Sequence, residues 1–503
     1  MDVLFIIPSS ASEAYQGLAD NYAAIEPPTW ALLLANAVRK KQYSCGILDC
    51  NAENLTDTDA IKQIEYIKPR LVCFTLYGQN PNAGTTSMIG GERLGKKLKS
   101  YNKSIKTCFV GSHVSALPRE VISLDYVDFI LLNEGVYALC DLLESDLINI
   151  KNIDGIGYKD EEGIIHLSSN AKIVSQERMD LDLPGYAWDL LPKKSKPLDL
   201  YRAHYWHTNF LEKDRSPFAS IYTSLGCQFA CNFCMINIVN RNNNNEDAHA
   251  GHFRGMRFWS PQFILNELGI LADMGVKTIR LSDEMFFLNR KYYVPILEGI
   301  ISRNYKFNMW AYARVDTIRE DQLKLFKQAG INWLCLGIEA GNQNVRLDID
   351  KGRFKDVNIR EVVKKIEDHG IQVLGNYMFG FPTDNLDTMN ETLDLALDLN
   401  TAHANFYTTQ ALPGSPLYIE ALRNNWDLPT DKKEYAFLSY DCKPLATNFL
   451  SPEEVLKFRD DAWNKYFSNP QYLKKVEKIF GIEATNNISD MAKIKLKRKV
   501  LGD

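Results

Sequence analysis

Two blocks of alternating short apolar runs and helical patterns constrain the fold of this chain more than any other feature. In the first block the strand candidates are 3–7, 45–48, 71–76, 107–110 and 127–131, and the helix candidates are 29–40, 59–67, 87–100 and 118–123. This alternation is typical of a doubly wound parallel sheet, in which ligands bind beyond the carboxyl ends of the strands. The sequence therefore predicts an α/β protein that begins with such a sheet.

The second block starts near residue 218 and repeats the alternation six times. Its strand candidates are 219–223, 278–281, 308–312, 333–338, 373–379 and 404–409, and its helix candidates are 261–274, 291–302, 320–329, 355–369 and 386–399. Six consecutive β/α units predict a partial (β/α)6 barrel, whose functional groups belong at the carboxyl ends of its strands.

The length of 503 residues exceeds what one ordinary core supports, so several domains are expected. We predict a first domain over 1–150 and a linker over 151–215, which contains a small hairpin and the segment LPGYAWDLLP. The barrel is predicted over 216–420, and helices that cap the barrel over 421–503.

Composition narrows the setting of the protein. The formal net charge of −5 argues against a nucleic-acid binder, which usually carries a basic surface. The start MDVLFIIPSS lacks a basic segment before its short apolar run, and no run approaches the length of a membrane span. Ten cysteines are too sparse for a disulfide scaffold. A reducing cytoplasm is therefore expected.

Three of the ten cysteines stand together in the segment YTSLGCQFACNFCMIN, directly after the first predicted barrel strand. Cys227, Cys231 and Cys234 have the spacing C-x3-C-x2-C. Thiolates are the natural ligands of iron–sulfur clusters, and three of them leave one iron of a four-iron cube open for another ligand. A zinc site completed by His249 or His252, and a cluster of cysteines without a metal, remain as alternatives from the triplet alone.

With an aromatic residue before its last cysteine, the triplet resembles the signature of the radical S-adenosylmethionine (SAM) superfamily. The resemblance implies that Cys227, Cys231 and Cys234 hold a 4Fe–4S cluster. It also implies that the open iron binds the amino and carboxylate groups of SAM, and that Phe233 lies near the adenine.

Later segments match the same superfamily in order along the chain: IRLSDEMF, WAYARVD, LGIEAGNQ, GNYMFGFPTD and LPGSPLY. The resemblance implies that Asp283 and Glu284 face the methionine amine, and that Arg314 and Glu339 face SAM or the substrate. Gly380 belongs to the motif whose backbone approaches the adenine. No residue is assigned a catalytic role.

The first block resembles the cobalamin-binding domain that precedes the barrel in many radical SAM enzymes. The matching segments are EPPTWALLLANAVRK, CGILDCNAENL, VGSHVSALPREV and DFILLNEGVYAL. The resemblance implies a cobalamin tail in a crevice lined by Thr75, Tyr77, Gly78, Gly111, Ser112, His113, Glu134 and Gly135. The motif D-x-H-x-x-G, which supplies a histidine to cobalt in other cobalamin proteins, is absent, so cobalamin is expected without a histidine lower ligand.

Together the resemblances imply a methyl transfer to an unactivated carbon of a small molecule, sugar, lipid or natural-product intermediate. They also imply an electron donor such as flavodoxin or ferredoxin. Ring closure, oxidation or rearrangement with the same cofactors is an alternative, and so is a non-catalytic sensor of the cluster or cobalamin. A methylthiotransferase fits less well, because the first block lacks three further cluster cysteines.

Overall fold

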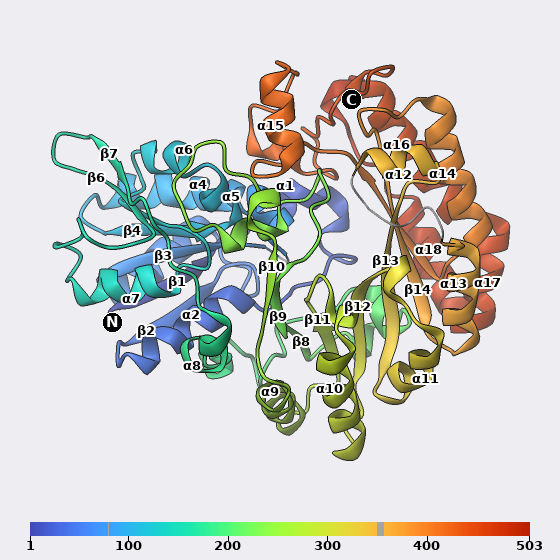
Figure 1. Cartoon of the computed structure of the whole chain (residues 1–503), viewed down its shortest axis with the longest axis horizontal. Helices are drawn as coiled ribbons and strands as arrows, with labels where there is room; N and C mark the ends of the chain where they lie inside the picture. Colours follow the sequence, from blue (N-terminus) through green and yellow to red (C-terminus); the bar gives the residue numbers. More distant parts are fainter. Residues whose placement is uncertain (79, 350–356) are drawn as a thin grey trace.

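The computed structural model describes residues 1–78, 80–349 and 357–503, and it is organised around two sheets, one mainly and one wholly parallel (Figure 1). The first sheet has the strand order β2-β1-β3-β4-β5-β6-β7, and the second has the order β15-β14-β13-β12-β11-β8. A separate two-stranded hairpin, β9–β10, follows the first strand of the second sheet.

The first sheet is parallel from β2 to β5 and then continues through two antiparallel strands. Its strands are β1 (Val3–Ile7), β2 (Cys45–Asp49), β3 (Leu71–Leu76), β4 (Thr107–Gly111), β5 (Phe129–Leu131), β6 (Ile156–Lys159) and β7 (Ile165–Leu167). The hairpin that was predicted inside the linker is therefore the antiparallel edge of this sheet. The domain boundary near residue 150 stays a prediction.

Helices cover both faces of the first sheet, as a doubly wound sheet requires. They are α1 (Ala11–Tyr15), α2 (Thr29–Lys40), α3 (Asp57–Ile67), α4 (Gly84–Tyr101), α5 (Ser112–Ala116), α6 (Pro118–Ser123) and α7 (Val136–Glu144). Alternate residues of β1 point to opposite faces: Val3 and Phe5 pack in one core with α2 and α7, whereas Leu4 and Ile6 pack in another with α3, α4 and α6.

The second sheet curls into an open barrel with every neighbouring pair of strands parallel. Its strands are β8 (Phe218–Ile221), β11 (Thr278–Leu281), β12 (Asn308–Arg314), β13 (Ile331–Glu339), β14 (Gln372–Phe379) and β15 (His403–Thr408). The helices that alternate with them are α9 (Pro261–Asp273), α10 (Arg290–Ser302), α11 (Glu320–Gln328), α12 (Gln343–Asp348), α13 (Ile359–Asp368) and α14 (Leu386–Leu399). The predicted fold class, a doubly wound sheet followed by a partial six-stranded barrel, is confirmed.

The predicted elements differ from the observed ones mainly at their ends. Strands β12 and β13 are longer than predicted because they continue into the polar residues Arg314 and Glu339. The predicted start of the helix over 355–369, Lys355, lies outside the described residues, and α13 begins at Ile359 after its N-cap residue Asn358. Hairpin strands β9 (Ser224–Cys227) and β10 (Gly255–Phe258) were not predicted, because a long Asn-rich segment separates two very short runs.

The end of the chain packs on the barrel. Helices α15 (Pro416–Arg423), α16 (Pro452–Phe467), α17 (Pro470–Phe480) and α18 (Ile482–Ala492) follow β15, and the short α8 (Met179–Asp182) lies in the segment between the two sheets. The buried guanidinium of Arg459 on α16 donates to the Phe406 carbonyl of β15 at 2.8 Å, which fixes α16 against the edge strand. Among the described helices, none has both the length and the apolar character needed to cross a bilayer.

Candidate active site

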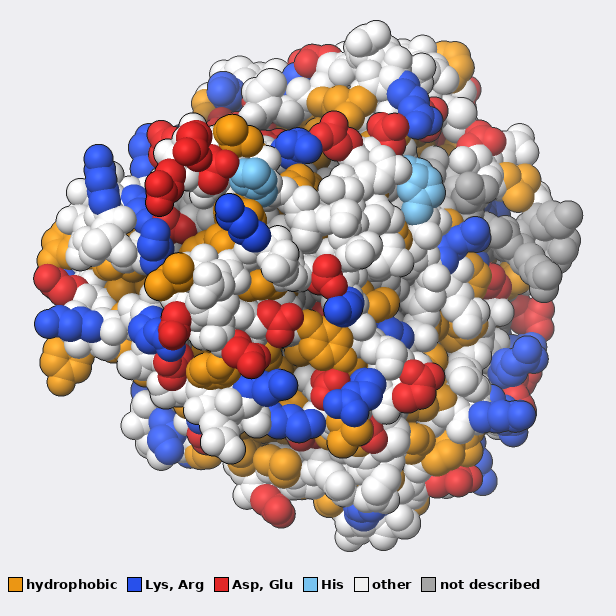
Figure 2. All heavy atoms as spheres, turned by 60° about the vertical axis from the view of Figure 1, so that its left-hand side comes forward, with side chains coloured by type: hydrophobic (Ala, Val, Ile, Leu, Met, Phe, Trp, Pro, Cys, Tyr) orange, Lys and Arg blue, Asp and Glu red, His pale blue; other side chains and the backbone are white. Residues whose placement is uncertain are grey.

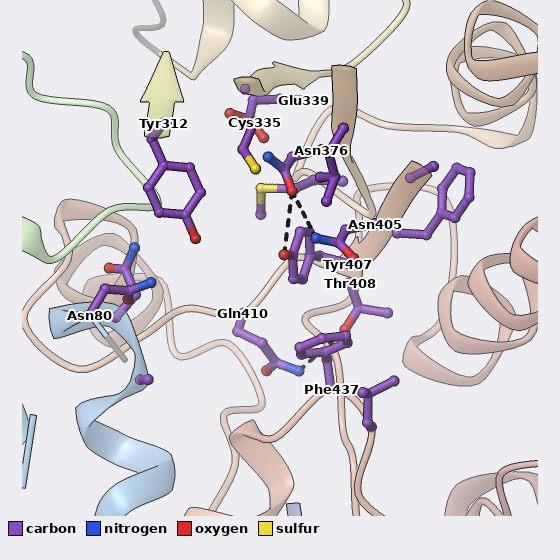
Figure 3. Close-up of a pocket in the computed structure, with 18 of the residues that line it drawn as sticks. Asn80, Tyr312, Cys335, Glu339, Asn376, Asn405, Tyr407, Thr408, Gln410 and Phe437 are labelled. Atoms are coloured by element: carbon purple, nitrogen blue, oxygen red, sulfur yellow. Dashed lines mark hydrogen bonds between the residues drawn. The ribbon is translucent and has the colours of Figure 1, made fainter. Parts of the chain in front are cut away.

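A cavity of about 510 Å³ lies at the mouth of the barrel, where functional groups were expected. All three clustered cysteines line it, together with side chains from β12, β13, β14 and β15. The N-terminal domain contributes Asn80, Asn82 and Ala83 from the segment after β3 and Thr86 from the start of α4. Figure 3 shows Asn80 on this loop, across the cavity from the barrel residues. The cavity therefore joins both halves of the chain.

The loop that carries the cysteines is held by Asn237. The backbone N–H of Cys227 donates to Asn237 Oδ1 at 2.7 Å, and Asn237 Nδ2 donates to the Phe229 carbonyl at 3.1 Å. Gly226 precedes the first cysteine with φ +86°, and a Cβ there would lie 2.2 Å from the Gly255 carbonyl oxygen. The close approach of β10 thus requires glycine at this position.

The three cysteines form no disulfide, are half-buried and face the same cavity. Burial raises the pKa of Cys227 to about 12 and that of Cys234 well above its ordinary value. Buried thiols of this kind stay protonated until a metal displaces the proton. The three sulfur donors lie on one loop and face space for a further ligand. This arrangement fits an iron–sulfur cluster in which one iron has no cysteine ligand.

The zinc alternative finds no support in the described residues. The His249 and His252 rings pack against each other at a tilt of 33° with centroids 3.7 Å apart, and His249 Nδ1 accepts from the Gly251 N–H at 3.2 Å. Neither histidine is among the residues that line the cavity. Within residues 1–78, 80–349 and 357–503, no three histidine, cysteine or acidic side chains, the cysteine triplet included, are grouped to hold one single metal ion.

Four of the six residues predicted to contact SAM line the cavity: Phe233, Glu284, Arg314 and Glu339. The Oε1 atom of Glu284 is buried without a hydrogen-bond partner among the described residues, and burial raises the pKa of this carboxyl to about 7. A buried carboxylate without a partner is costly, so it suits a site that is completed by a cationic ligand such as the SAM amine.

Arg314 and Glu339 are fixed at the ends of adjacent strands. Arg314 pairs with Asp316 through two hydrogen bonds of 2.9 and 2.8 Å, and its guanidinium lies 3.8 Å from the centre of the Phe229 ring on the cysteine loop. Glu339 has φ +62° at an irregularity in the pairing of β13 with β14. A non-glycine residue in this conformation is uncommon and is often found at functional sites.

Asp283 and Gly380, the other two predicted SAM residues, do not line the cavity. The Asp283 carboxylate accepts from the Thr223 N–H at 2.6 Å, the Thr223 hydroxyl at 2.7 Å and the Ser224 hydroxyl at 2.5 Å. Burial raises its pKa to about 6. Gly380 packs against α16, where a Cβ would lie 2.5 Å from Val455 Cγ1. In this structure both residues contact the segments that surround the cavity rather than the cavity itself. Their predicted contacts with SAM stay predictions.

The eight predicted cobalamin residues come together at the carboxyl edge of the first sheet, but none lines the cavity. Tyr77 stacks on Trp30 with ring centroids 4.3 Å apart, and the Ser112 hydroxyl donates to the Pro81 carbonyl at 2.5 Å. His113 is 1% exposed and lies 3.0 Å from the Thr85 hydroxyl. These side chains have partners within the protein, and the role of the crevice in holding the cobalamin tail stays a prediction.

The other predicted crevice residues are also packed by protein. Thr75 is buried, and a Cβ on Gly78, Gly111 or Gly135 would come within 3 Å of neighbouring atoms. Glu134 forms a buried ion pair with Arg257 of β10, with hydrogen bonds of 2.7 and 3.1 Å. This pair links the N-terminal domain to hairpin β9–β10, whose first strand ends at Cys227.

Sequence reasoning missed Asn80 and Asn82 as individual site residues. Asn82 Oδ1 accepts from the Met235 N–H at 3.0 Å, and the Asn82 amide lies 3.8 Å from Cys234 Sγ. Asn80 Oδ1 is buried without a partner among the described residues, in a wall that a bound cofactor would complete. The only sequence signal was the position of these residues after the third predicted strand, because ligands of a doubly wound sheet bind beyond the carboxyl ends of its strands.

Comparison with known proteins agrees with this geometry. A family model described as the Radical SAM superfamily matches residues 221–396, and one described as a B12 binding domain matches residues 15–143. An uncharacterized methyltransferase of Pyrococcus horikoshii is 26% identical over 479 residues, covering 94% of each chain. These matches confirm both resemblances found in the sequence.

Two further proteins show how far the likeness extends. An anaerobic magnesium-protoporphyrin IX monomethyl ester cyclase of Rubrivivax gelatinosus is 24% identical over 485 residues, covering 94% of this chain and 79% of the cyclase. The solved structure of the radical SAM methyltransferase TsrM from Kitasatospora setae, with cobalamin and a [4Fe-4S] cluster bound, superimposes with a TM-score of 0.66. It covers 98% of this chain and 99% of its own at 14% identity, so it supports the fold.

Proposed function

We propose that this chain, which joins a B12-binding domain to a radical SAM domain, is a cobalamin-dependent enzyme that methylates an unactivated carbon of a small molecule. One observation carries the proposal. The three cysteines, the ends of the barrel strands and a loop of the B12-binding domain line a single cavity. Both predicted cofactors and a substrate would thus meet in one space.

The residues of this chain have separable tasks in that space. Cys227, Cys231 and Cys234 would hold the 4Fe–4S cluster, while Asn237 fixes their loop. The bound cofactors supply the one-electron cleavage of SAM and the methyl carrier, and the protein supplies binding, orientation and exclusion of water. Glu284 would accept hydrogen bonds from the SAM amine, because its buried carboxylate oxygen has no partner among the described residues.

Phe233, Arg314 and Glu339 support the same assignment to SAM, because they line the cavity from three different elements. The loop after β3 would face the corrin ring, since Asn80 and Asn82 form the wall that the N-terminal domain presents to the cluster loop. The predicted domain boundaries, 1–150, 151–215, 216–420 and 421–503, form part of this proposal.

The decisive experiment is anaerobic reconstitution of the full chain with iron, sulfide and hydroxocobalamin, followed by reduction in the presence of SAM. We expect 5′-deoxyadenosine and S-adenosylhomocysteine to appear together, and Cys234→Ala to form neither. The variant Cys140→Ala, which alters a buried cysteine of α7 that does not line the cavity, serves as the matched control. A protein that forms only 5′-deoxyadenosine is not a methyltransferase, and one that cleaves no SAM is not a radical enzyme.

A second candidate reaction is a ring closure, oxidation or rearrangement with the same cofactors. It is favoured by the similarity to the cyclase of Rubrivivax gelatinosus, which extends over 94% of this chain. The same product analysis separates the two: methylation consumes a second SAM for each product, whereas ring closure forms no S-adenosylhomocysteine.

The proposed enzyme needs a one-electron donor such as flavodoxin or ferredoxin, and we place it in a reducing cytoplasm because none of its ten cysteines forms a disulfide. Nucleic acid is not the proposed substrate. The net charge is −5, and Lys and Arg side chains are interspersed with Asp and Glu on the face drawn in Figure 2. Reduction of the cluster by purified flavodoxin, followed by absorbance, tests the donor.

A further inference from the structure

Neutral hydrogen-bonding groups cluster on β14 and β15, at the edge of the second sheet opposite β8 and its cysteine loop. Asn376 Oδ1 accepts from Asn405 Nδ2 at 3.1 Å and from the Tyr407 hydroxyl at 3.5 Å (Figure 3). All three side chains line the cavity. Because Asn376 Oδ1 is already used twice, the Asn376 Nδ2 hydrogens are the part of this network that is left for a ligand.

Three further polar atoms on the cavity wall are buried and have no partner among the described residues. They are Gln410 Oε1, His403 Nδ1 and Trp310 Nε1, on side chains that are 7%, 5% and 3% exposed. Buried polar atoms are almost always hydrogen-bonded, because leaving one unpaired is costly. Their concentration around one cavity indicates that a ligand completes them.

The walls around these groups are aromatic. Tyr312 projects from β12 towards the cavity, and Phe437 packs edge-on against Tyr407 with ring centroids 4.8 Å apart (Figure 3). Trp206, from the segment before the barrel, and Trp463 of α16 also line the cavity. Aromatic side chains favour stacked or edge-to-face contacts with the rings of a ligand.

Charge on this side of the cavity is balanced. Arg459 donates to Asp460 at 2.7 Å and to the Phe406 carbonyl at 2.8 Å. Burial lowers the pKa of His204 and of His403 to about 3, so both rings are neutral at physiological pH. Among the described residues that line the cavity, the other cation is Arg314, which pairs with Asp316. The described wall thus offers amides and hydroxyls rather than an unpaired cation.

We propose that this chamber is the substrate site and that it binds a neutral aromatic molecule through a carbonyl or carboxamide group. Asn376, Asn405 and Gln410 hold the polar group, and the ring packs against Tyr312 and Phe437. The inference rests on the proposed function and narrows its substrate class: an anionic carboxylate or phosphate lacks a cationic partner among these side chains.

Two probes that differ in charge test this assignment: indole-3-acetamide and indole-3-acetate. Their binding to the full-length reconstituted protein with SAM is measured by anaerobic equilibrium dialysis. We expect the amide to bind at least about tenfold more tightly, because the acetate buries a charge without a counter-ion. Equal affinities, tighter binding of the acetate, or no binding of either probe overturns the proposal.

Variants then locate the bound amide. Asn376→Leu and Gln410→Leu should each weaken indole-3-acetamide about tenfold, whereas Asn390→Leu on the exposed face of α14 should not. Tyr407→Phe, which removes a single hydroxyl, decides the matter if a leucine variant does not fold. Unchanged affinity in the folded variants refutes the site.

The unaltered protein is assayed for SAM cleavage in the same preparation. Cleavage without amide binding refutes only the substrate class, whereas absence of cleavage refutes the proposed function itself.

Discussion

Replacing Glu134 by alanine is expected to lower the free energy of unfolding by about 3–5 kcal/mol, because it leaves the charge of Arg257 buried without a counter-ion. The side chains of this ion pair are 0% and 9% exposed. The guanidinium makes hydrogen bonds of 2.7 and 3.1 Å to the carboxylate, and it also donates to Asn240 Oδ1 at 2.9 Å and to the Val174 carbonyl at 2.6 Å.

The position of this pair ties its loss to the cluster. Asn240 donates to the carbonyl of Gly255 at 3.2 Å, and Gly255 is the residue of β10 that pairs with Cys227. Glu134→Ala should therefore reduce iron uptake as well as stability. Both are measured, by urea unfolding followed by circular dichroism and by iron content after anaerobic reconstitution.

Two comparisons make the reasoning refutable. The double variant Glu134→Leu with Arg257→Met removes both charges and should be less destabilised than Glu134→Ala, because no charge remains buried. Arg290→Ala breaks an ion pair to Asp321 whose side chains are 61% and 58% exposed, and should cost at most about 1 kcal/mol. If Glu134→Ala costs no more than Arg290→Ala, the pair does not stabilise the contact between the domains.

Three further outcomes are expected. Burial raises the pKa of Glu267 from 4.5 to about 7, so the folded state holds this proton more tightly and stability falls as pH rises through that window. In the native chain this loss of unfolding free energy amounts to roughly 3 kcal/mol, and the variant Glu267→Gln should not show it. Equal unfolding free energies of the native chain at acidic and mildly basic pH would contradict this prediction. Asn237→Ala removes two hydrogen bonds from the cysteine loop and should lower iron content at reconstitution, with Asn390→Ala as the control; full iron loading would show that the loop needs no such support. Glu284→Gln should weaken SAM about tenfold in equilibrium dialysis, and unchanged affinity would remove this residue from the SAM site.

The strands and the cysteine loop were predictable because their signals are local. Buried parallel strands read as short apolar runs, and the spacing of Cys227, Cys231 and Cys234 is contiguous in sequence. The neighbours Asp283 and Glu284 show where such reasoning ends. Both follow β11, yet one carboxylate turns to Thr223 and the other faces the cavity. The path of the backbone after β11 decides which of the two carboxylates faces the cavity.

Long-range contacts account for the rest of what the sequence did not reveal. Hairpin β9–β10 pairs residues on either side of an Asn-rich segment, and Asn82 meets Cys234 across the boundary between the two halves of the chain. The polar set on β14 and β15 also escaped prediction, because asparagine and glutamine in a strand carry no sequence signal of their own. Whether these side chains can bind a ligand depends on the cavity, which several separate segments of the chain enclose.

The lining of the cavity includes Ala14 near the start of the chain and Met491 of α18 near its end. The chamber consequently has no complete wall until α18 has been synthesised. A chain cut before α18 would keep its cysteines but lose Met491 from the lining of the reactive space.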